Sequence, residues 1–114
     1  MSALVAVLST TFAFLAGDPE PRHEPPMREA VASFYGYGPG ATGACGTLYP
    51  NGLANRTLPC GTRLVVCARR CVRAVVDDRG PYVWGRDFDL STSLAGAVGF
   101  DFVRGVQTIR WRLA

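Results

Sequence analysis

Five carboxyl groups lie in residues 31–114, and all five belong to aspartates. Asp77 and Asp78 are adjacent and end a run of alternating residues, the pattern of a strand with one buried face. We expect Asp78 to point inward with Ala74 and Val76 at the strand end, and Asp77 to project into solvent. A partly desolvated carboxyl group favours its protonated form, which can act as a general acid. Asp78 is therefore the first candidate for acid–base chemistry.

The four cysteines could form disulfides or bind a metal. Cys67 and Cys71 flank a three-residue turn in a predicted hairpin, so they face each other at a separation that suits a disulfide. This leaves Cys45 to pair with Cys60. Zinc binding is the alternative, but the spacing differs from the paired knuckles of zinc sites. Disulfides would indicate an oxidising compartment.

Histidine chemistry is excluded from most of the chain. The single histidine, His23, lies among prolines outside residues 31–114. The remainder therefore cannot contain a multi-histidine metal site or a Ser-His-Asp triad. We expect neither a metal nor a cofactor.

Short strands must position these groups. Residues 31–37 are β-prone and precede a Gly-Pro-Gly turn, and residues 63–68 and 71–77 form the predicted hairpin. Residues 106–113 alternate again, with three apolar side chains on the inward face. These three are Ile109, Trp111 and Leu113.

One short helix is predicted at residues 91–98 from the spacing of its apolar residues. Asp89 or Ser91 can cap its start, and Gly99 suits its left-handed end. For Asp89, this structural role as a cap or turn anchor is the favoured interpretation. Short strands, 13 glycines in the chain and one small helix predict a compact, mainly β barrel.

The first 30 residues differ from the rest. Residues 1–16 contain an apolar stretch whose length fits the core of a secretory signal peptide and is too short to span a bilayer. No basic residue precedes this stretch, and its end lacks the small-residue pattern of a cleavage site, so a short apolar packing helix is the alternative. Residues 17–30 hold four of the eight prolines and are predicted to be an extended linker. We expect no transmembrane span.

The chain suits one small domain, residues 31–114, rather than two. All basic residues are arginines, and this domain carries ten of them against five aspartates. A basic domain can bind nucleic acid, an anionic membrane or an anionic cell-wall polymer. The arginines are scattered, however, and no nucleic-acid motif accompanies them. We therefore expect a mixed solvated surface, a monomer and no nucleic-acid partner.

Three stretches, in this order, resemble the rare lipoprotein A-like double-psi β-barrel family, which is related to the expansin and barwin barrels. The stretches are VASFYGYG (31–38), LANRTLPCGTRLVV (53–66) and VVDDRGPYVWGRDFDLS (75–91). The resemblance covers residues 31–114 and implies a six-stranded double-psi β-barrel with one or two short helices. The ACG and LPCGT segments resemble a secreted, disulfide-bearing branch of the family, so we expect a secreted or cell-envelope protein.

The resemblance also implies a shallow groove for a polysaccharide, with peptidoglycan as the expected partner. Some family members are lytic transglycosylases, which cleave the glycan and close a 1,6-anhydro ring. Asp78, in the DRGP motif, would be the catalytic acid and then the base. Five further residues are expected to bind substrate or support the site: Tyr35, Asn55, Arg79, Tyr82 and Trp84.

Two departures from the family pattern bear on catalysis. Asn55 stands where the family usually has histidine, and asparagine cannot move a proton near neutral pH. Residues 31–114 also lack the glutamate of many active members. Three hypotheses therefore stay open: a lytic transglycosylase-like enzyme, a non-catalytic glycan-binding or wall-loosening module, and a structural barrel without enzyme activity, such as one encoded by a phage.

Overall fold

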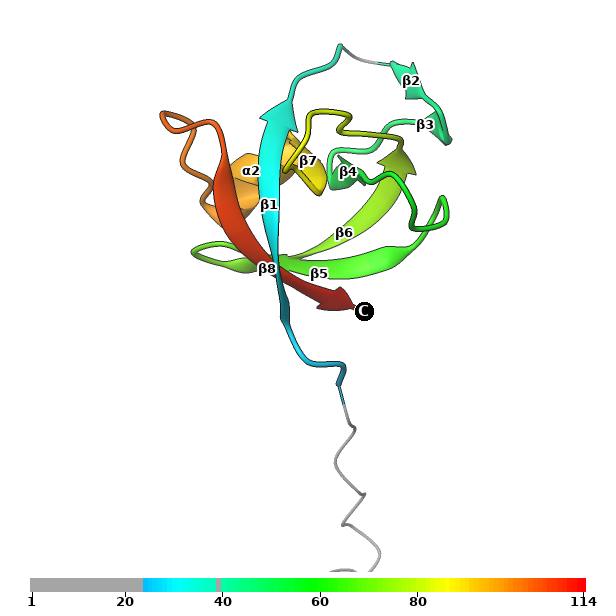
Figure 1. Cartoon of the computed structure of the whole chain (residues 1–114). Coiled ribbons are helices and arrows are strands. Elements are labelled where there is room, and N and C mark those ends of the chain that lie inside the picture. The colour runs from blue at the N-terminus through cyan, green and yellow to red at the C-terminus, as the bar shows by residue number, and fades with distance from the viewer. Residues whose placement is uncertain (1–23, 39) are drawn as a thin grey trace, which may run out of the picture.

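Six strands close into a barrel in the computed structural model, which describes residues 24–38 and 40–114 (Figure 1). The order around the barrel is β1-β7-β4-β6-β5-β8, and β2 and β3 form a separate two-stranded sheet. The elements are β1 (Arg28–Tyr35), β2 (Thr42–Gly43), β3 (Gly46–Thr47), β4 (Gly52–Ala54), β5 (Arg63–Cys67), β6 (Cys71–Asp78), β7 (Phe88–Ser91), α2 (Thr92–Val98) and β8 (Gln107–Leu113). The expected six-stranded, mainly β barrel is confirmed. The apolar segment and most of the predicted linker lie outside the described residues.

The barrel is of mixed type. β1 pairs in parallel with β7, and β4 pairs in parallel with β6, whereas the other four neighbouring pairs are antiparallel. The predicted hairpin is present as β5 and β6, with Cys67 directly opposite Cys71. The small β2–β3 sheet lies beyond the tip of β6 (Figure 1). It therefore covers the end of the strand that carries the adjacent aspartates.

The predicted helix is also present. The side chain of Ser91 caps α2 by accepting a hydrogen bond from Leu94 N at 3.1 Å, and Gly99 ends the helix with φ 75°. Such a positive φ favours glycine. Because Ser91 is the cap, the side chain of Asp89 remains available for another role.

Apolar side chains from every barrel strand and from α2 fill the interior. The largest fully buried ones are Phe88, Leu53, Leu64, Leu90, Leu94 and Ile109. Trp111 packs edge-on against Phe88 with 5.3 Å between ring centroids. Leu113 departs from the expected inward pattern of β8, because it is the last residue of the strand and is 45% exposed.

The first strand begins at Arg28 rather than at residue 31, and it ends at Tyr35. Its first three residues pair with β8, where Arg28 lies opposite Trp111. Their charges suggested a linker, and only the pairing with a distant strand makes them part of the sheet.

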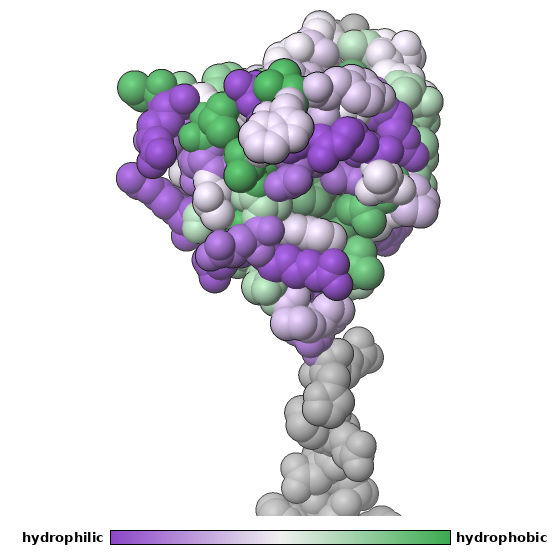
Figure 2. Space-filling view, in the orientation of Figure 1, coloured by the Kyte–Doolittle hydropathy of each residue, from purple (hydrophilic) through white to green (hydrophobic). Residues whose placement is uncertain are grey.

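The surface in the orientation of Figure 1 mixes hydrophilic and hydrophobic side chains (Figure 2). Within residues 24–38 and 40–114, no helix has both the length and the apolar character needed to cross a membrane.

Candidate functional site

Asp77 is buried, contrary to the expectation that it projects into solvent. It is 2% exposed. The face of β6 on which it lies is covered by the segment that contains Tyr49 and Gly52, which the alternation within β6 could not reveal. The register between β4 and β6 also shifts here, so that Ala54 pairs with Asp78 and Asp77 has no partner in β4.

The surroundings of Asp77 hold one carboxylate oxygen and leave the other unsatisfied. Tyr49 N donates a hydrogen bond of 2.8 Å to Oδ2, whereas Oδ1 is buried without a partner among the described residues. Burial raises the pKa of this carboxyl group. Gly52 makes room for it, because a Cβ at that position would lie 1.7 Å from Oδ2.

Asp78 is half-buried and is fixed by backbone groups. Its Oδ1 accepts hydrogen bonds from Ala44 N and from Arg79 N, each at 2.8 Å. Gly43 packs against it so closely that a Cβ there would lie 2.5 Å from the carboxyl carbon. Both donors are backbone amides, so the loop at β2 orients the Asp78 carboxyl group as a hydrogen-bond acceptor.

A hollow of about 390 Å³ brings four of the predicted site residues together: Tyr35, Asp78, Arg79 and Tyr82. We call this hollow the groove. It is also lined by Asp89 and Arg86, which the sequence analysis did not assign to a site. Asn55 and Trp84 do not line it. The groove therefore contains two carboxyl groups, one at the end of β6 and one in β7.

Asp89 lines the groove and does not cap α2, which was one of the structural roles that the sequence favoured for it. Ser33 Oγ donates a hydrogen bond of 3.0 Å to its Oδ1, because β1 and β7 place Ser33 opposite Asp89. Burial raises the pKa of Asp89, while the hydrogen bond from Ser33 and the charge of Arg86 oppose this shift. The sequence carries a signal for this position in the alternation of the FDLS segment. Phe88 and Leu90 are buried on one face of the strand, so Asp89 between them lies on the other face.

Tyr35 places an unsatisfied hydroxyl group beside the aspartates. The hydroxyl oxygen is buried and has no hydrogen-bond partner among the described residues. Burial, and then the negative charge of Asp77, raise the pKa of Tyr35. The neutral phenol is therefore the form present near neutral pH, and its proton is available to an acceptor.

Arg79 extends away from the Asp78 carboxylate. Its Nη1 donates hydrogen bonds to the carbonyl oxygens of Asn55 and Leu58, at 3.1 and 2.6 Å. Only its backbone N–H contacts Asp78. Arg79 thus connects the end of β6 to the loop between β4 and β5.

Asn55 is engaged within that same loop. Its Oδ1 accepts hydrogen bonds from Thr57 N and Leu58 N, and its Nδ2 donates one of 3.0 Å to the carbonyl oxygen of Asp87. These contacts are those of a side chain that holds two loops together.

The two remaining aromatic candidates lie on the loop between β6 and β7. Trp84 is 98% exposed and Tyr82 is 79% exposed. Both side chains therefore present their rings to solvent. Tyr82 borders the groove, and Trp84 lies two residues beyond it in the chain.

Both predicted disulfides are present. Cys45 is bonded to Cys60, and Cys67 is bonded to Cys71, so no cysteine is free. The zinc site considered for these cysteines is therefore not formed. The first disulfide joins the β2–β3 segment to the loop beside Arg79, whose Nη2 lies 3.4 Å from Cys60 Sγ.

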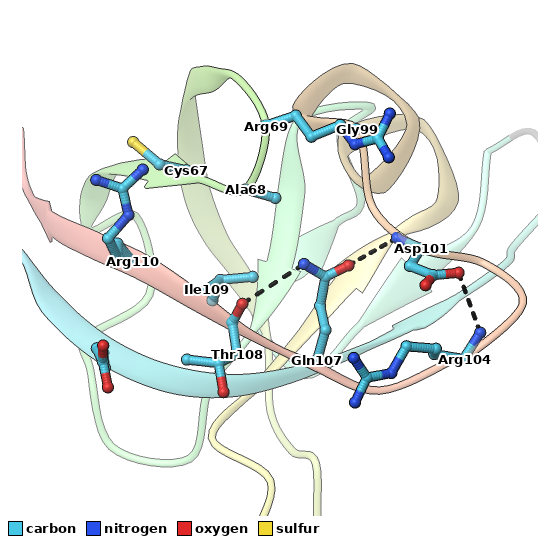
Figure 3. Close-up of a pocket in the computed structure, with 11 residues that line it drawn as sticks. Cys67, Ala68, Arg69, Gly99, Asp101, Arg104, Gln107, Thr108, Ile109 and Arg110 are labelled. Carbon is cyan, nitrogen blue, oxygen red and sulfur yellow. Dashed lines mark hydrogen bonds between the residues drawn. The ribbon is translucent and has the colours of Figure 1, made fainter.

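A second hollow, of about 470 Å³, lies where the β5–β6 turn and the loop after α2 meet β8 (Figure 3). Two of its side chains accept hydrogen bonds from backbone N–H groups of the same region. Gln107 Oε1 accepts a hydrogen bond of 2.6 Å from Asp101 N, and Asp101 Oδ1 accepts one from Arg104 N. Cys67 is the only predicted site residue that lines this second hollow, so the candidate catalytic and binding residues do not meet here.

The closed barrel of mixed strand pairing, with one aspartate at the end of β6 and one in β7, is that of a double-psi β-barrel protein. The family model described as lytic transglycolase matches residues 28–111, and the chain belongs to this double-psi β-barrel family. The sequence of the chain is 44% identical over 91 residues to that of a probable endolytic peptidoglycan transglycosylase RlpA of Nostoc sp.. That match covers 72% of this chain and 24% of the relative, so the chain spans about a quarter of the relative's length.

Solved expansin structures share the fold. The apo expansin of Clavibacter michiganensis superposes with a TM-score of 0.66 at 25% identity, over 78% of this chain and half of the expansin. A mutant of an expansin from the same organism, in complex with cellohexaose, superposes with the same TM-score at 24% identity, over 78% of this chain and 50% of that one. The expected resemblance to the RlpA and expansin barrels is therefore confirmed.

Proposed function

We propose that this domain acts on peptidoglycan glycan as a lytic transglycosylase. The observation that carries the proposal is the pair of carboxyl groups in one groove, which differ in environment. Asp78 accepts two backbone hydrogen bonds, whereas Asp89 accepts one from the Ser33 hydroxyl group and has a pKa that its partial burial raises. Groups with such different environments suit the two halves of an acid–base reaction.

In the proposed reaction, Asp89 donates its proton to the glycosidic oxygen as the bond from that oxygen to the anomeric carbon breaks. The 6-hydroxyl of the same sugar bonds to the anomeric carbon, and Asp78 accepts the proton that this hydroxyl releases. The product is a 1,6-anhydro sugar, and no water molecule is consumed. In this scheme Asp78 is the base. The family resemblance implies a simpler variant of the same mechanism, in which Asp78 acts first as the acid and then as the base.

The other candidate residues are proposed to bind or support the glycan. The neutral hydroxyl of Tyr35 donates a hydrogen bond in the groove, and the ring of Tyr82 offers a face on which a sugar stacks. Asn55 and Arg79 support the site by holding the β4–β5 loop against the end of β6. The two disulfides agree with a location outside the cytoplasm, where the peptidoglycan lies.

The alternative is a non-catalytic module that binds glycan in the same groove. Asn55 favours it, because the family's usual histidine is missing and the asparagine side chain is already engaged. The expansin mutant in complex with cellohexaose contains this kind of barrel over 50% of its length, which agrees with an oligosaccharide as ligand.

The two proposals are separated by comparing the full chain with Asp78→Asn and Asp89→Asn variants on purified peptidoglycan. Release of soluble glycan fragments by the wild-type chain, and its loss in both variants at unchanged Tm, would support the enzyme. Release that is unaffected by either substitution would remove these carboxyl groups from the mechanism. Binding by all three proteins without any release would support the non-catalytic module.

A further inference from the structure

Three exposed apolar side chains follow one another on the loop between β6 and β7. Tyr82, Val83 and Trp84 are 79%, 53% and 98% exposed, respectively. A cluster of exposed apolar residues marks a binding surface more often than isolated ones do. Only part of this loop lines the groove, because Trp84 lies outside the groove.

The loop is tethered at both ends by one side chain. Arg56 Nη1 donates hydrogen bonds to the carbonyl oxygen of Pro81, at 2.6 Å, and to that of Arg86. Its Nη2 lies 3.8 Å from Asp87 Oδ1. These contacts fix the two ends of the segment that carries the exposed aromatics. The backbone on both sides of Trp84 is therefore positioned before any ligand arrives, which lowers the entropic cost of binding.

A separate hollow of about 480 Å³ lies against this loop. It is lined by Arg56, Tyr82, Val83, Trp84 and Gly85. Tyr82 and Val83 also line the groove, so the two hollows share one wall. A chain molecule that leaves the groove past Tyr82 would meet Trp84 next.

We propose that Trp84 and Arg56 form a second sugar subsite outside the groove, which takes a further residue of the same glycan chain. This rests on the proposed function, in that the groove must hold glycan. Trp84 supplies the stacking face, and Arg56 is a positioning residue that keeps the loop in place. The guanidinium is engaged with backbone carbonyls, so the subsite recognises the apolar face of a sugar rather than a charged substituent.

The subsite predicts a dependence of affinity on ligand length. Peptidoglycan-derived oligosaccharides of increasing length are titrated into the full chain, with binding measured by calorimetry and by Trp fluorescence. The chain has two tryptophans, and Trp111 is partly buried in the barrel, so a change at the exposed Trp84 is distinguishable. Once the ligand is long enough to reach Trp84, the affinity should rise about 3- to 10-fold, with a blue shift in emission.

Trp84→Ala should abolish this gain and leave the affinity for the shortest bound ligand unchanged. Arg56→Ala should reduce the gain in the same way, and Arg56→Lys should restore part of it. The ratio of long-ligand to short-ligand affinity is the readout, because a general loss of stability would lower both affinities together. Val103→Ala is the matched control, since Val103 is also 98% exposed but lies on the loop after α2.

The outcomes separate the two proposals. Short ligands that bind to the wild-type chain with no gain on lengthening, or a gain that survives Trp84→Ala, would overturn the subsite and leave the groove intact. Failure of the wild-type chain to bind any of these oligosaccharides would overturn both the subsite and the proposed function.

Discussion

Replacing Asp77 with asparagine should stabilise the barrel, and the gain should grow with pH. Asparagine is nearly the same size, and its Oδ1 can accept the hydrogen bond that Tyr49 N now donates to Oδ2. Its amide group can take the place of the buried Oδ1, which has no partner among the described residues. The substitution therefore removes a buried charge without removing a hydrogen bond.

The sign of the pH dependence follows from the raised pKa of Asp77. In the unfolded chain this group loses its proton near its ordinary pKa of 3.8, whereas the folded chain keeps the proton to a higher pH. Between these two values the folded state binds more protons, so the free energy of unfolding falls as the pH rises. Removing a buried charge whose hydrogen bonding is incomplete contributes on the order of 1 kcal/mol to stability. We therefore expect the variant to gain on the order of 1 kcal/mol at neutral pH, or about 4–8 °C in Tm.

The assay is a series of thermal melts followed by circular dichroism, from about pH 3 to about pH 8. The difference in Tm between Asp77→Asn and wild type should be small at the acidic end and should rise to a plateau. Asp101→Asn is the control, because Asp101 is exposed and its acceptor role in a turn can be kept by asparagine. A wild-type chain that is the more stable of the two at neutral pH would refute the reasoning, as would a difference independent of pH.

Three further predictions concern the frame of the site. Replacing both Cys45 and Cys60 with serine should lower the free energy of unfolding by about 3 kcal/mol, given the 15-residue separation; denaturant melts measure this, and an unchanged midpoint would contradict it. Asn55→His should lower the Tm, because histidine cannot replace all three hydrogen bonds to backbone groups; an unchanged Tm would show that these bonds matter little. A chain shortened to begin at residue 24 should melt cooperatively under oxidising conditions, whereas one that begins at residue 31 should melt at a lower temperature because the start of β1 pairs with β8.

Local patterns in the sequence predicted much of the fold. The Cys67–Cys71 turn specified the β5–β6 hairpin, and the apolar spacing before Gly99 specified α2. Both signals lie within a few residues of the structure that they predict. The start of β1 was missed because its evidence is a partner strand almost eighty residues away, in which Trp111 lies opposite Arg28.

The candidate site was predictable only in part, because contacts between segments that are distant in the sequence decide which side chains are buried and which reach the groove. Alternation along β6 could not report that Tyr49 and Gly52 cover the Asp77 side chain. Likewise, a helix-capping role for Asp89 is reasonable from its neighbours alone. Its place in the groove depends on the parallel pairing of β7 with β1, which brings Ser33 to its side.

The contacts of Arg56 show the same limit. In the sequence it is one of ten scattered arginines in residues 31–114. In the structure it spans both ends of the loop that carries Trp84. Its acceptors are backbone carbonyls, which no side-chain pattern in the sequence identifies.

Asp78 and Asp89 are proposed to cleave glycan without consuming water. To test this reaction, the full chain is incubated with purified peptidoglycan and the released fragments are analysed by mass spectrometry. We expect fragments that end in 1,6-anhydro sugars, lighter by one water than hydrolysis products, and their absence with Asp89→Asn. Fragments with ordinary reducing ends, or no fragments from a wild-type chain that binds the glycan, would contradict it.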